Sequence, residues 1–179
     1  MKKIVYILFT CILALTLTST TPKQYQLRDT RSVIKSLYIY TFATLVEWPK
    51  QKRTGPFRIG VFGESTAVYD DLVTKYSGKS IGSQTIVIEN FRSKSSINDV
   101  HILYISEEYS HYISEVRGNL SGKSTLLVTE KAGSLSKGAM VNFIVEGDTQ
   151  KYEINKRNAK KQKLVIADKL SSLAARVVE

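Results

Sequence analysis

The sequence predicts an α/β fold: a single three-layer α/β/α domain with a mainly parallel sheet and a C-terminal antiparallel hairpin. Short apolar segments alternate with amphipathic ones along most of the chain, as they do when helices bury both faces of a parallel sheet. The pattern changes near the C-terminus, where two apolar segments flank Gly147-Asp148. The chain has 179 residues and no long internal repeat, which suits one domain behind a leader.

The start of the chain has the composition of a secretory signal peptide. A Met-Lys-Lys start precedes a mostly apolar run over 4–17 and small polar residues at 18–21. The apolar run is shorter than the about 20 residues that span a bilayer. We therefore expect residues 1–20 to be removed and residues 21–179 to form an exported domain. Two alternatives stay open, lipidation of Cys11 and an uncleaved anchor.

Loss of the leader changes the charge and the cysteine content. The formal net charge falls from +10 to +8 because Lys2 and Lys3 are removed, and the only cysteine, Cys11, is removed with them. No disulfide is expected in the mature domain, so its stability must come from its own core. Export also argues against nucleic acid as the partner of this positive charge.

The first helix of the domain is predicted to end at the chain's only tryptophan. Apolar side chains recur at helical spacing over 34–45, and Asp29 or Thr30 would cap the start. Pro49 disfavours helical geometry at the preceding residue, so we expect the helix to stop at Trp48. A tryptophan at a helix end can bury its ring and keep the indole N–H near a polar acceptor.

The later strands are predicted from short apolar runs that turn residues bound. Four of them alternate with helices, and two more form the hairpin around Gly147-Asp148. The predicted strands are 57–63, 85–88, 101–106, 125–129, 140–145 and 151–154.

Three further helices are predicted between and after these strands. The first has Ser65 or Thr66 as its cap and stops at Gly78. Another is expected over 107–117, while residues 95–100 form a loop or one helical turn. The last helix has Asp168 as a candidate cap and an apolar face made of Leu170, Leu173, Ala174 and Val177.

The densest basic segment, residues 156–163, is predicted to form an exposed helical turn with its flanks. It contains five cations: Lys156, Arg157, Lys160, Lys161 and Lys163. Two interpretations remain open, a solvated surface and a patch that steers an acidic partner electrostatically.

Phosphate-loop signals are weak. The tripeptide Gly-Lys-Ser occurs at 78–80 and at 122–124, but neither copy has the glycine that a phosphate loop requires five residues earlier. Both copies also precede strands, so we interpret them as helix-to-strand turns. A candidate site for a small anion remains at Gly63, Glu64 and Ser65, between a strand and a helix.

No pattern of catalytic residues emerges. His101 and His111 lack metal-ligand spacing, and no nucleophile motif of the Gly-x-Ser-x-Gly type occurs. We therefore expect a protein that is not an enzyme and that holds no metal and no cofactor.

The segment 34–49 behind a signal peptide resembles the YfiR family of periplasmic proteins (DUF4154-like). The most specific pieces are Glu47-Trp48-Pro49, Asn142-Phe143 and Ile154-Asn155. The resemblance continues through 57–63, 101–106, 125–133, 138–146, 151–155 and 170–177.

This resemblance implies a three-layer α/β domain that acts as a non-catalytic periplasmic regulator and forms homodimers. Its implied partner is the periplasmic sensor portion of an inner-membrane diguanylate cyclase, whose cyclic di-GMP output it would repress. A sensor histidine kinase or another membrane receptor is an alternative partner, and a periplasmic small-anion sensor is an alternative function. Relatives that respond to redox use cysteine pairs, which the mature chain lacks.

Six motif residues are candidates for either partner contact or packing: Glu47, Trp48, Pro49, Asn142, Phe143 and Asn155. The two asparagines flank the hairpin strands, where they can bond exposed backbone groups, and Trp48 can fill a gap under the sheet edge. Family motifs mark a fold as readily as a site.

Overall fold

The computed structural model describes residues 30–64 and 67–179. The predicted signal peptide, 1–20, and the candidate helix caps at Asp29 and 65–66 lie outside the described residues. Within the two described ranges, no helix combines the length and the apolar character needed to cross a membrane.

Eight strands of the described part of the chain form one mainly parallel sheet, in the order β10-β8-β7-β6-β5-β2-β4-β3. Within it, β7 with β8 and β3 with β4 are antiparallel pairs. This confirms the predicted fold class, including the C-terminal hairpin. The strands are β2 (Phe57–Phe62), β3 (Ser80–Ile81), β4 (Gln84–Phe91), β5 (Ile102–Ile105), β6 (Leu126–Thr129), β7 (Val141–Glu146), β8 (Thr149–Asn155) and β10 (Arg176–Val178).

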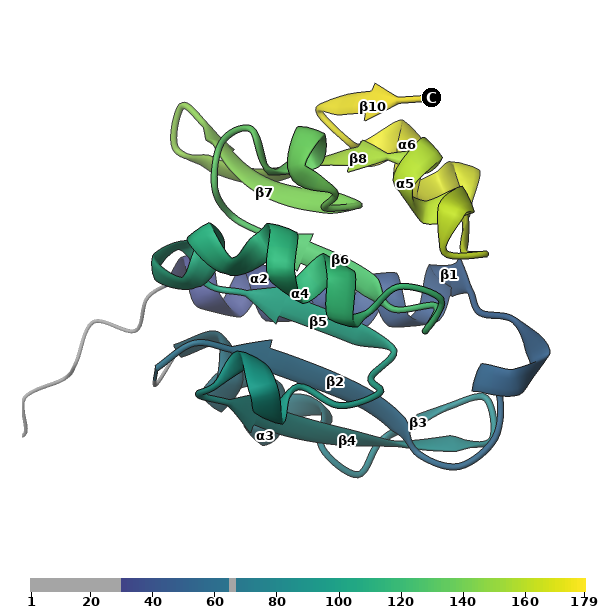
Figure 1. Ribbon diagram of the computed structural model, residues 1–179. Helices are drawn as coiled ribbons and strands as arrows, with labels where there is room; N and C mark the ends of the chain where they lie inside the picture. The colour runs from purple at the N-terminus through teal and green to yellow at the C-terminus, as the bar shows by residue number, and fades with distance from the viewer. Residues whose placement is uncertain (1–29, 65–66) are drawn as a thin grey trace, which may run out of the picture.

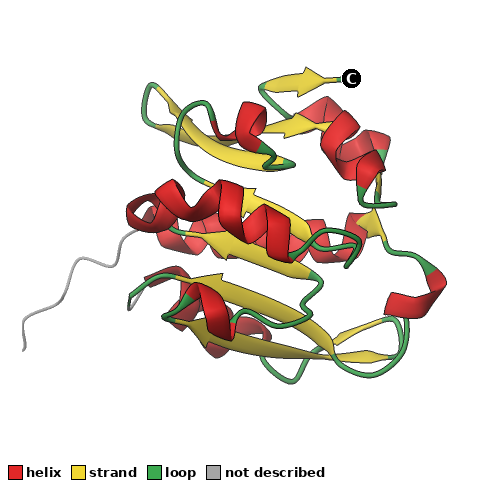
Figure 2. Ribbon diagram, viewed as in Figure 1, coloured by secondary structure: helices red, strands yellow, loops and turns green. Residues whose placement is uncertain are grey.

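Helices cover both faces of this sheet, as Figure 2 shows in red and yellow. Phe42 of α2 and Leu72 of α3 pack into one apolar layer, whereas Ile113 and Val116 of α4 pack into the other. Figure 1 shows α4 in front of β5 and β6 and α2 behind them. Full burial of one such side chain stabilises the folded state by about 1.5–3 kcal/mol, so both apolar layers stabilise the packing of helices on the sheet. The α-helices are α2 (Thr30–Leu45), α3 (Ala67–Tyr76), α4 (Ile113–Asn119), α5 (Lys156–Lys161) and α6 (Asp168–Leu173), and the 3₁₀ helices are η1 (Lys50–Lys52), η2 (Lys94–Ser96), η3 (Glu107–Tyr112) and η4 (Ser134–Lys137).

The first helix is shorter than predicted. Helix α2 ends at Leu45 rather than at Trp48, and the next two residues form β1 (Val46–Glu47). Strand β1 pairs antiparallel with β9 (Val165–Ile166). The prediction was wrong because the proline after Trp48 sets only the latest possible helix end, whereas a partner strand from far along the chain takes up the backbone groups earlier.

The last helix is also shorter than predicted. Helix α6 follows Ala167, so Asp168 is its first residue and not its cap. The chain becomes extended at Ala174, and β10 (Arg176–Val178) then joins the sheet parallel to β8. Val177 therefore lies in a strand, where β-branched side chains pack well and the open edge of β8 offers backbone partners.

Both Gly-Lys-Ser copies lie in helix-to-strand turns, as predicted. Gly78 has a φ of 77° between α3 and β3, and Gly122 has a φ of 76° between α4 and β6. Glycine adopts this left-handed geometry without the steric cost of a Cβ atom.

The strand order reverses beside β2. The chain passes from β2 through α3 to β4 on one side, and it later continues from β5 through η3 and α4 to β6 on the other. Because the helices that follow β2 and β5 cover opposite faces, a crevice opens at the carboxyl ends of these two neighbouring strands. Ligands of open α/β sheets bind at such a switch point.

Candidate functional site

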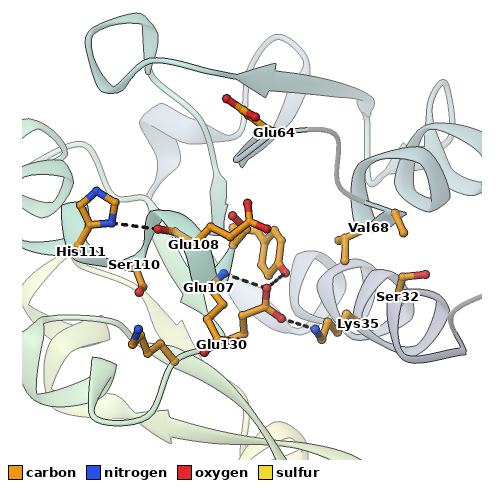
Figure 3. A pocket seen from close by; sticks show the side chains of 13 residues that line it. Ser32, Lys35, Glu64, Val68, Glu107, Glu108, Ser110, His111 and Glu130 are labelled. Carbon is orange, nitrogen blue, oxygen red and sulfur yellow. Dashed lines mark hydrogen bonds and ion pairs between the residues drawn. The ribbon is translucent and has the colours of Figure 1, made fainter.

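A cavity of about 510 Å³ lies at the carboxyl ends of β2, β5 and β6. Ser32 and Lys35 reach it from α2, Glu64 follows β2, and Glu130 follows β6 (Figure 3). We call it the carboxyl-end cleft. Its other lining residues are Ala67, Val68, Tyr104, Ser106, Glu107, Glu108, Ser110, His111 and Lys131.

Three donors hold Glu130 in place. The Tyr104 hydroxyl donates to Oε1 at 2.5 Å, the backbone N–H of Glu107 donates to the same oxygen at 3.0 Å, and Lys35 pairs with Oε2. Figure 3 shows the carboxylate between Lys35 and Glu107. Charge-assisted hydrogen bonds of this kind are about twice as strong as neutral ones, so the three contacts fix the position of the Glu130 carboxylate.

Tyr104 acts here as a hydrogen-bond donor. Burial, followed by the nearby Glu130 carboxylate, raises the pKa of its hydroxyl well above the usual range. The phenol therefore stays protonated at neutral pH and keeps donating to Glu130.

The lining of the cleft carries more negative than positive charge. Four carboxylates, those of Glu64, Glu107, Glu108 and Glu130, stand against two lysines. Across residues 30–64 and 67–179, no group of three or more histidine, cysteine, aspartate or glutamate side chains is arranged to hold a metal ion.

The predicted anion site at Gly63, Glu64 and Ser65 falls partly in this cleft. Glu64 lines the cleft, and the backbone N–H of Gly63 already donates to the Phe91 carbonyl at 3.2 Å. Ser65 lies outside the described residues. The site stays a prediction, but the Glu64 carboxylate and its acidic neighbours repel a simple anion.

Most residues of the cleft were missed by sequence reasoning. They lie between residues 32 and 131 with no local spacing that would mark them. The available signal was positional: Ser106, Glu107 and Glu108 follow one predicted strand, and Glu130 follows another. Carboxyl ends of neighbouring parallel strands meet at one edge of a sheet, but only the strand order shows which strands are neighbours.

Trp48 packs at the opposite end of the same strands. Its ring is 6% exposed and makes edge contacts with Phe57 and His101, at centroid distances of 5.1 and 5.9 Å. Its Nε1 is buried and has no hydrogen-bond partner among the described residues, contrary to the expectation of a nearby acceptor. A second cavity of about 440 Å³ is lined by Glu47, which is exposed, by the buried Trp48 and by Arg53. Pro49 directly precedes η1, so the Glu47-Trp48-Pro49 motif connects the end of β1 to the start of η1.

A buried polar group lies beside Trp48, at the amino ends of β2, β4 and β5. We call Lys52, Gln84 and His101 the amino-end cluster. His101 Nδ1 accepts the Arg58 backbone N–H at 3.1 Å, and His101 Nε2 lies 2.7 Å from the Lys52 carbonyl oxygen. This pair of contacts requires a neutral ring with its proton on Nε2. Burial lowers the pKa of His101, in agreement with that state.

The other two members of the amino-end cluster also bond to backbone. Gln84 Nε2 donates to the Lys52 carbonyl at 2.9 Å, and Lys52 Nζ donates to the Val100 carbonyl at 3.0 Å. Lys52 Nζ also pairs with the Asp99 carboxylate at 2.5 Å. These contacts tie the loop after Trp48 to the sheet.

Asn142 is fully buried in a chain of polar side chains. It accepts the Thr129 hydroxyl at 2.7 Å and donates to Glu153 Oε1 at 3.0 Å. Arg176 Nε donates to the other Glu153 oxygen at 2.9 Å. The chain links β6, β7, β8 and β10, so the structure places Asn142 in sheet packing.

Asn155 and Phe143 also occupy internal positions. The Asn155 side chain accepts the Asn158 backbone N–H at 2.9 Å and thereby caps α5. Phe143 is 2% exposed and lies near Phe42, with ring centroids 6.0 Å apart. Both side chains therefore make contacts within the fold.

The basic segment forms α5 and its flank, as predicted. Lys156 pairs with Glu179 at 3.1 Å, and Arg157 Nη2 donates to the Glu179 backbone oxygen at 2.7 Å. Lys160, Lys161 and Lys163 are exposed. Arg157 is exposed as well, so four of the five cations contribute outward charge and only Lys156 is half-buried.

Comparison with known proteins gives one family match. The family model described as YfiR/HmsC-like (DUF4154) matches residues 32–175. No curated protein matches the chain.

Two solved structures share the fold at low sequence identity. One is described as the ABC domain in complex with L-Trp from Streptococcus pneumoniae, with 12% identity and a TM-score of 0.54 over 83% of this chain and 60% of that one. The other is a conserved domain protein from Vibrio cholerae O1 biovar El Tor, with 10% identity and a TM-score of 0.54 over 79% and 59%. This chain spans about 60% of their length, and identities this low show the fold alone.

Proposed function

The chain belongs to the YfiR/HmsC-like family, and on this basis we propose that it is an exported, non-catalytic regulator that represses a membrane-bound signalling protein. The family is known for periplasmic regulation and is regulatory rather than catalytic. The observation that carries the proposal is the family match over residues 32–175. The partner is the periplasmic sensor portion of an inner-membrane diguanylate cyclase, or of a sensor kinase. With a cyclase as partner, repression lowers cyclic di-GMP.

Pairing of β1 with β9 supports one candidate contact surface. Glu47 of the family motif lies opposite Val165, a large apolar side chain that is 58% exposed. Helix α5, with exposed Lys160 and Lys161, packs against β9. An apolar side chain beside a basic helix suits an acidic protein segment, and we call Glu47, Lys160, Lys161 and Val165 the β9 surface.

Repression requires that the protein distinguish two states of its partner. A regulator that binds both states equally does not change the equilibrium between them. A repressor must therefore bind the inactive state of its partner more tightly than the active state. The lysines of the β9 surface would mainly raise the association rate and make it depend on salt. Homodimers, implied by the family resemblance, are part of the proposal, and light scattering of the purified chain measures them.

The test combines binding with signalling output. The mature chain is mixed with the partner's periplasmic segment at low and high salt, and output is measured in cells that lack the protein. We expect higher output on deletion and binding that weakens with salt. Lys160→Glu with Lys161→Glu is expected to slow association, whereas Arg92→Glu, an exposed charge reversal after β4, serves as the control. Unchanged output together with no binding at micromolar concentration contradicts the proposal for that partner.

A further inference from the structure

We propose that the carboxyl-end cleft binds a small organic molecule through a positively charged ammonium group. This goes beyond the regulatory function and does not depend on it. It also differs from the anion site expected near Gly63, because the sign of the ligand's charge is reversed.

The place and the size of the cleft suit a ligand. It lies where β2 and β5 send their following helices to opposite faces, which is the position of ligand sites in open α/β sheets. Its volume of about 510 Å³ falls within the range of small-molecule pockets, about 300–1,000 Å³. Residues from α2, α3, η3 and the segments after three strands line it, so a ligand there contacts several separate parts of the chain.

Charge pairing inside the cleft leaves negative charge for a ligand. Lys35 forms an ion pair with Glu130, so the charges of these two side chains cancel within the cleft lining. Three exposed carboxylates of the lining remain, those of Glu64, Glu107 and Glu108, and Lys131 is the remaining lysine. The Glu64 carboxylate accepts the neutral Tyr109 hydroxyl at 3.2 Å and keeps its charge. Three carboxylates against one ammonium attract a cation and disfavour an anion of similar size.

An unsatisfied buried hydroxyl provides a second, independent observation. Ser106 lines the cleft, is 5% exposed, and its buried Oγ has no hydrogen-bond partner in the part of the chain that the structure describes. Buried hydroxyl groups are normally hydrogen-bonded, and each exception calls for a partner. An ammonium N–H donates to such an oxygen, and the same ammonium is attracted by the carboxylates of η3.

The tyrosine of the cleft fits the same chemistry. Tyr104 lines the cavity, and its hydroxyl is already committed to Glu130. The polar oxygens that remain for a ligand are the carboxylates of Glu64, Glu107 and Glu108 and the hydroxyl of Ser106, and they outnumber the single remaining ammonium group, that of Lys131. Oxygen acceptors around a cavity are what a primary or secondary ammonium group requires.

The experiment is calorimetric titration of the full mature chain with spermidine and with 1,5-diaminopentane. Glutarate, a dicarboxylate of matched length, is the control ligand at equal ionic strength. We expect saturable binding of at least one amine below about 10 mM and none of glutarate. The proposal is overturned if neither amine binds detectably up to this concentration, or if glutarate binds as tightly as the amines.

Variants then locate the binding. Glu64→Gln combined with Glu108→Gln is expected to weaken amine binding about three- to tenfold, because two exposed carboxylates are lost. Ser106→Ala is expected to weaken it about fivefold. Glu146→Gln, the same change on the distant hairpin, is expected to leave it unaltered. Thermal melting of each variant checks folding, and folded cleft variants with unaltered affinity overturn the assignment to this cleft.

Discussion

The two ends of the parallel strands use polar residues in different ways. At the amino ends, Lys52, Gln84 and His101 donate to or accept from backbone groups, and the Trp48 ring packs beside them. At the carboxyl ends, Glu130 is held by side chains and one backbone N–H, while neighbouring carboxylates line an open cavity.

This difference separates folding contacts from binding groups. A polar side chain that bonds backbone from another element replaces the hydrogen bonds that the backbone lost to water. A carboxylate that faces a cavity and lacks a cation makes no such contribution, since it stays hydrated until a ligand arrives. We therefore expect substitutions at the amino ends to change stability and substitutions in the cleft to change binding.

The largest expected effect is at Trp48. Trp48→Ala removes a buried ring that contacts Phe57 and His101, and it should cost about 3–5 kcal/mol of unfolding free energy. Denaturant unfolding measures it, with Leu173→Ala at a position 61% exposed as the control. A loss below about 1 kcal/mol together with lost partner binding would make Trp48 a contact residue and break the comparison.

A smaller loss of unfolding free energy is expected for a substitution at Asn142. Asn142→Ala deprives the Thr129 hydroxyl and the buried Glu153 carboxylate of a partner, which should cost about 1–3 kcal/mol. Thr129 ends the same strand that Glu130 follows, so this variant tests whether paired polar groups near the cleft still serve the fold. Equal unfolding midpoints for variant and wild type would contradict that role.

The pH dependence of stability tests the amino-end cluster. Burial lowers the pKa of His101 below its ordinary value of 6.5, so the unfolded chain binds a proton that the folded chain refuses. The contribution of neutral His101 to the free energy of unfolding is fully present above pH 6.5. It is lost as the pH falls from 6.5 toward the lowered pKa of the folded state. We expect His101→Gln to have a shallower fall in unfolding free energy than wild type below this pH, measured by urea unfolding. Identical slopes would exclude the neutral, buried state of His101.

Cleft carboxylates should have the smallest effect on stability. Glu108→Gln changes an exposed side chain that has no buried contact to lose, so the unfolding free energy should shift by no more than about 0.5 kcal/mol. The charge change is matched by Glu146→Gln on the hairpin. A destabilisation above about 1 kcal/mol in the first variant alone would show that the cleft serves the fold.

Sequence reasoning succeeded where the signal was local. The apolar runs of β2, β5 and β6 and the Gly147-Asp148 turn predict their own structure, because burial on both faces and turn geometry leave a pattern in a few residues. Strands β1, β9 and β10 have two or three residues each, which is too few for a period. They form because a partner edge is available, and that edge is known only once the chain is folded.

The cleft was harder to predict for a related reason. Lys35 and Glu130 meet across α2 and the end of β6, so no spacing in the sequence connects them. The conspicuous Glu47-Trp48-Pro49 motif instead directed attention to the opposite end of the sheet. A distinctive residue such as tryptophan is conspicuous in sequence, while an ordinary glutamate acquires its role from topology.

The most direct measurement of this difference is an NMR titration of the isotope-labelled mature domain with spermidine. We expect amide shifts in residues 32–35, 104–110 and 130–131, which line or adjoin the cleft, and a stationary Trp48 indole signal. Signals of Gln84 and His101 should also stay in place. Largest shifts at Trp48 and the amino-end cluster, with none in the three cleft segments, would contradict the account.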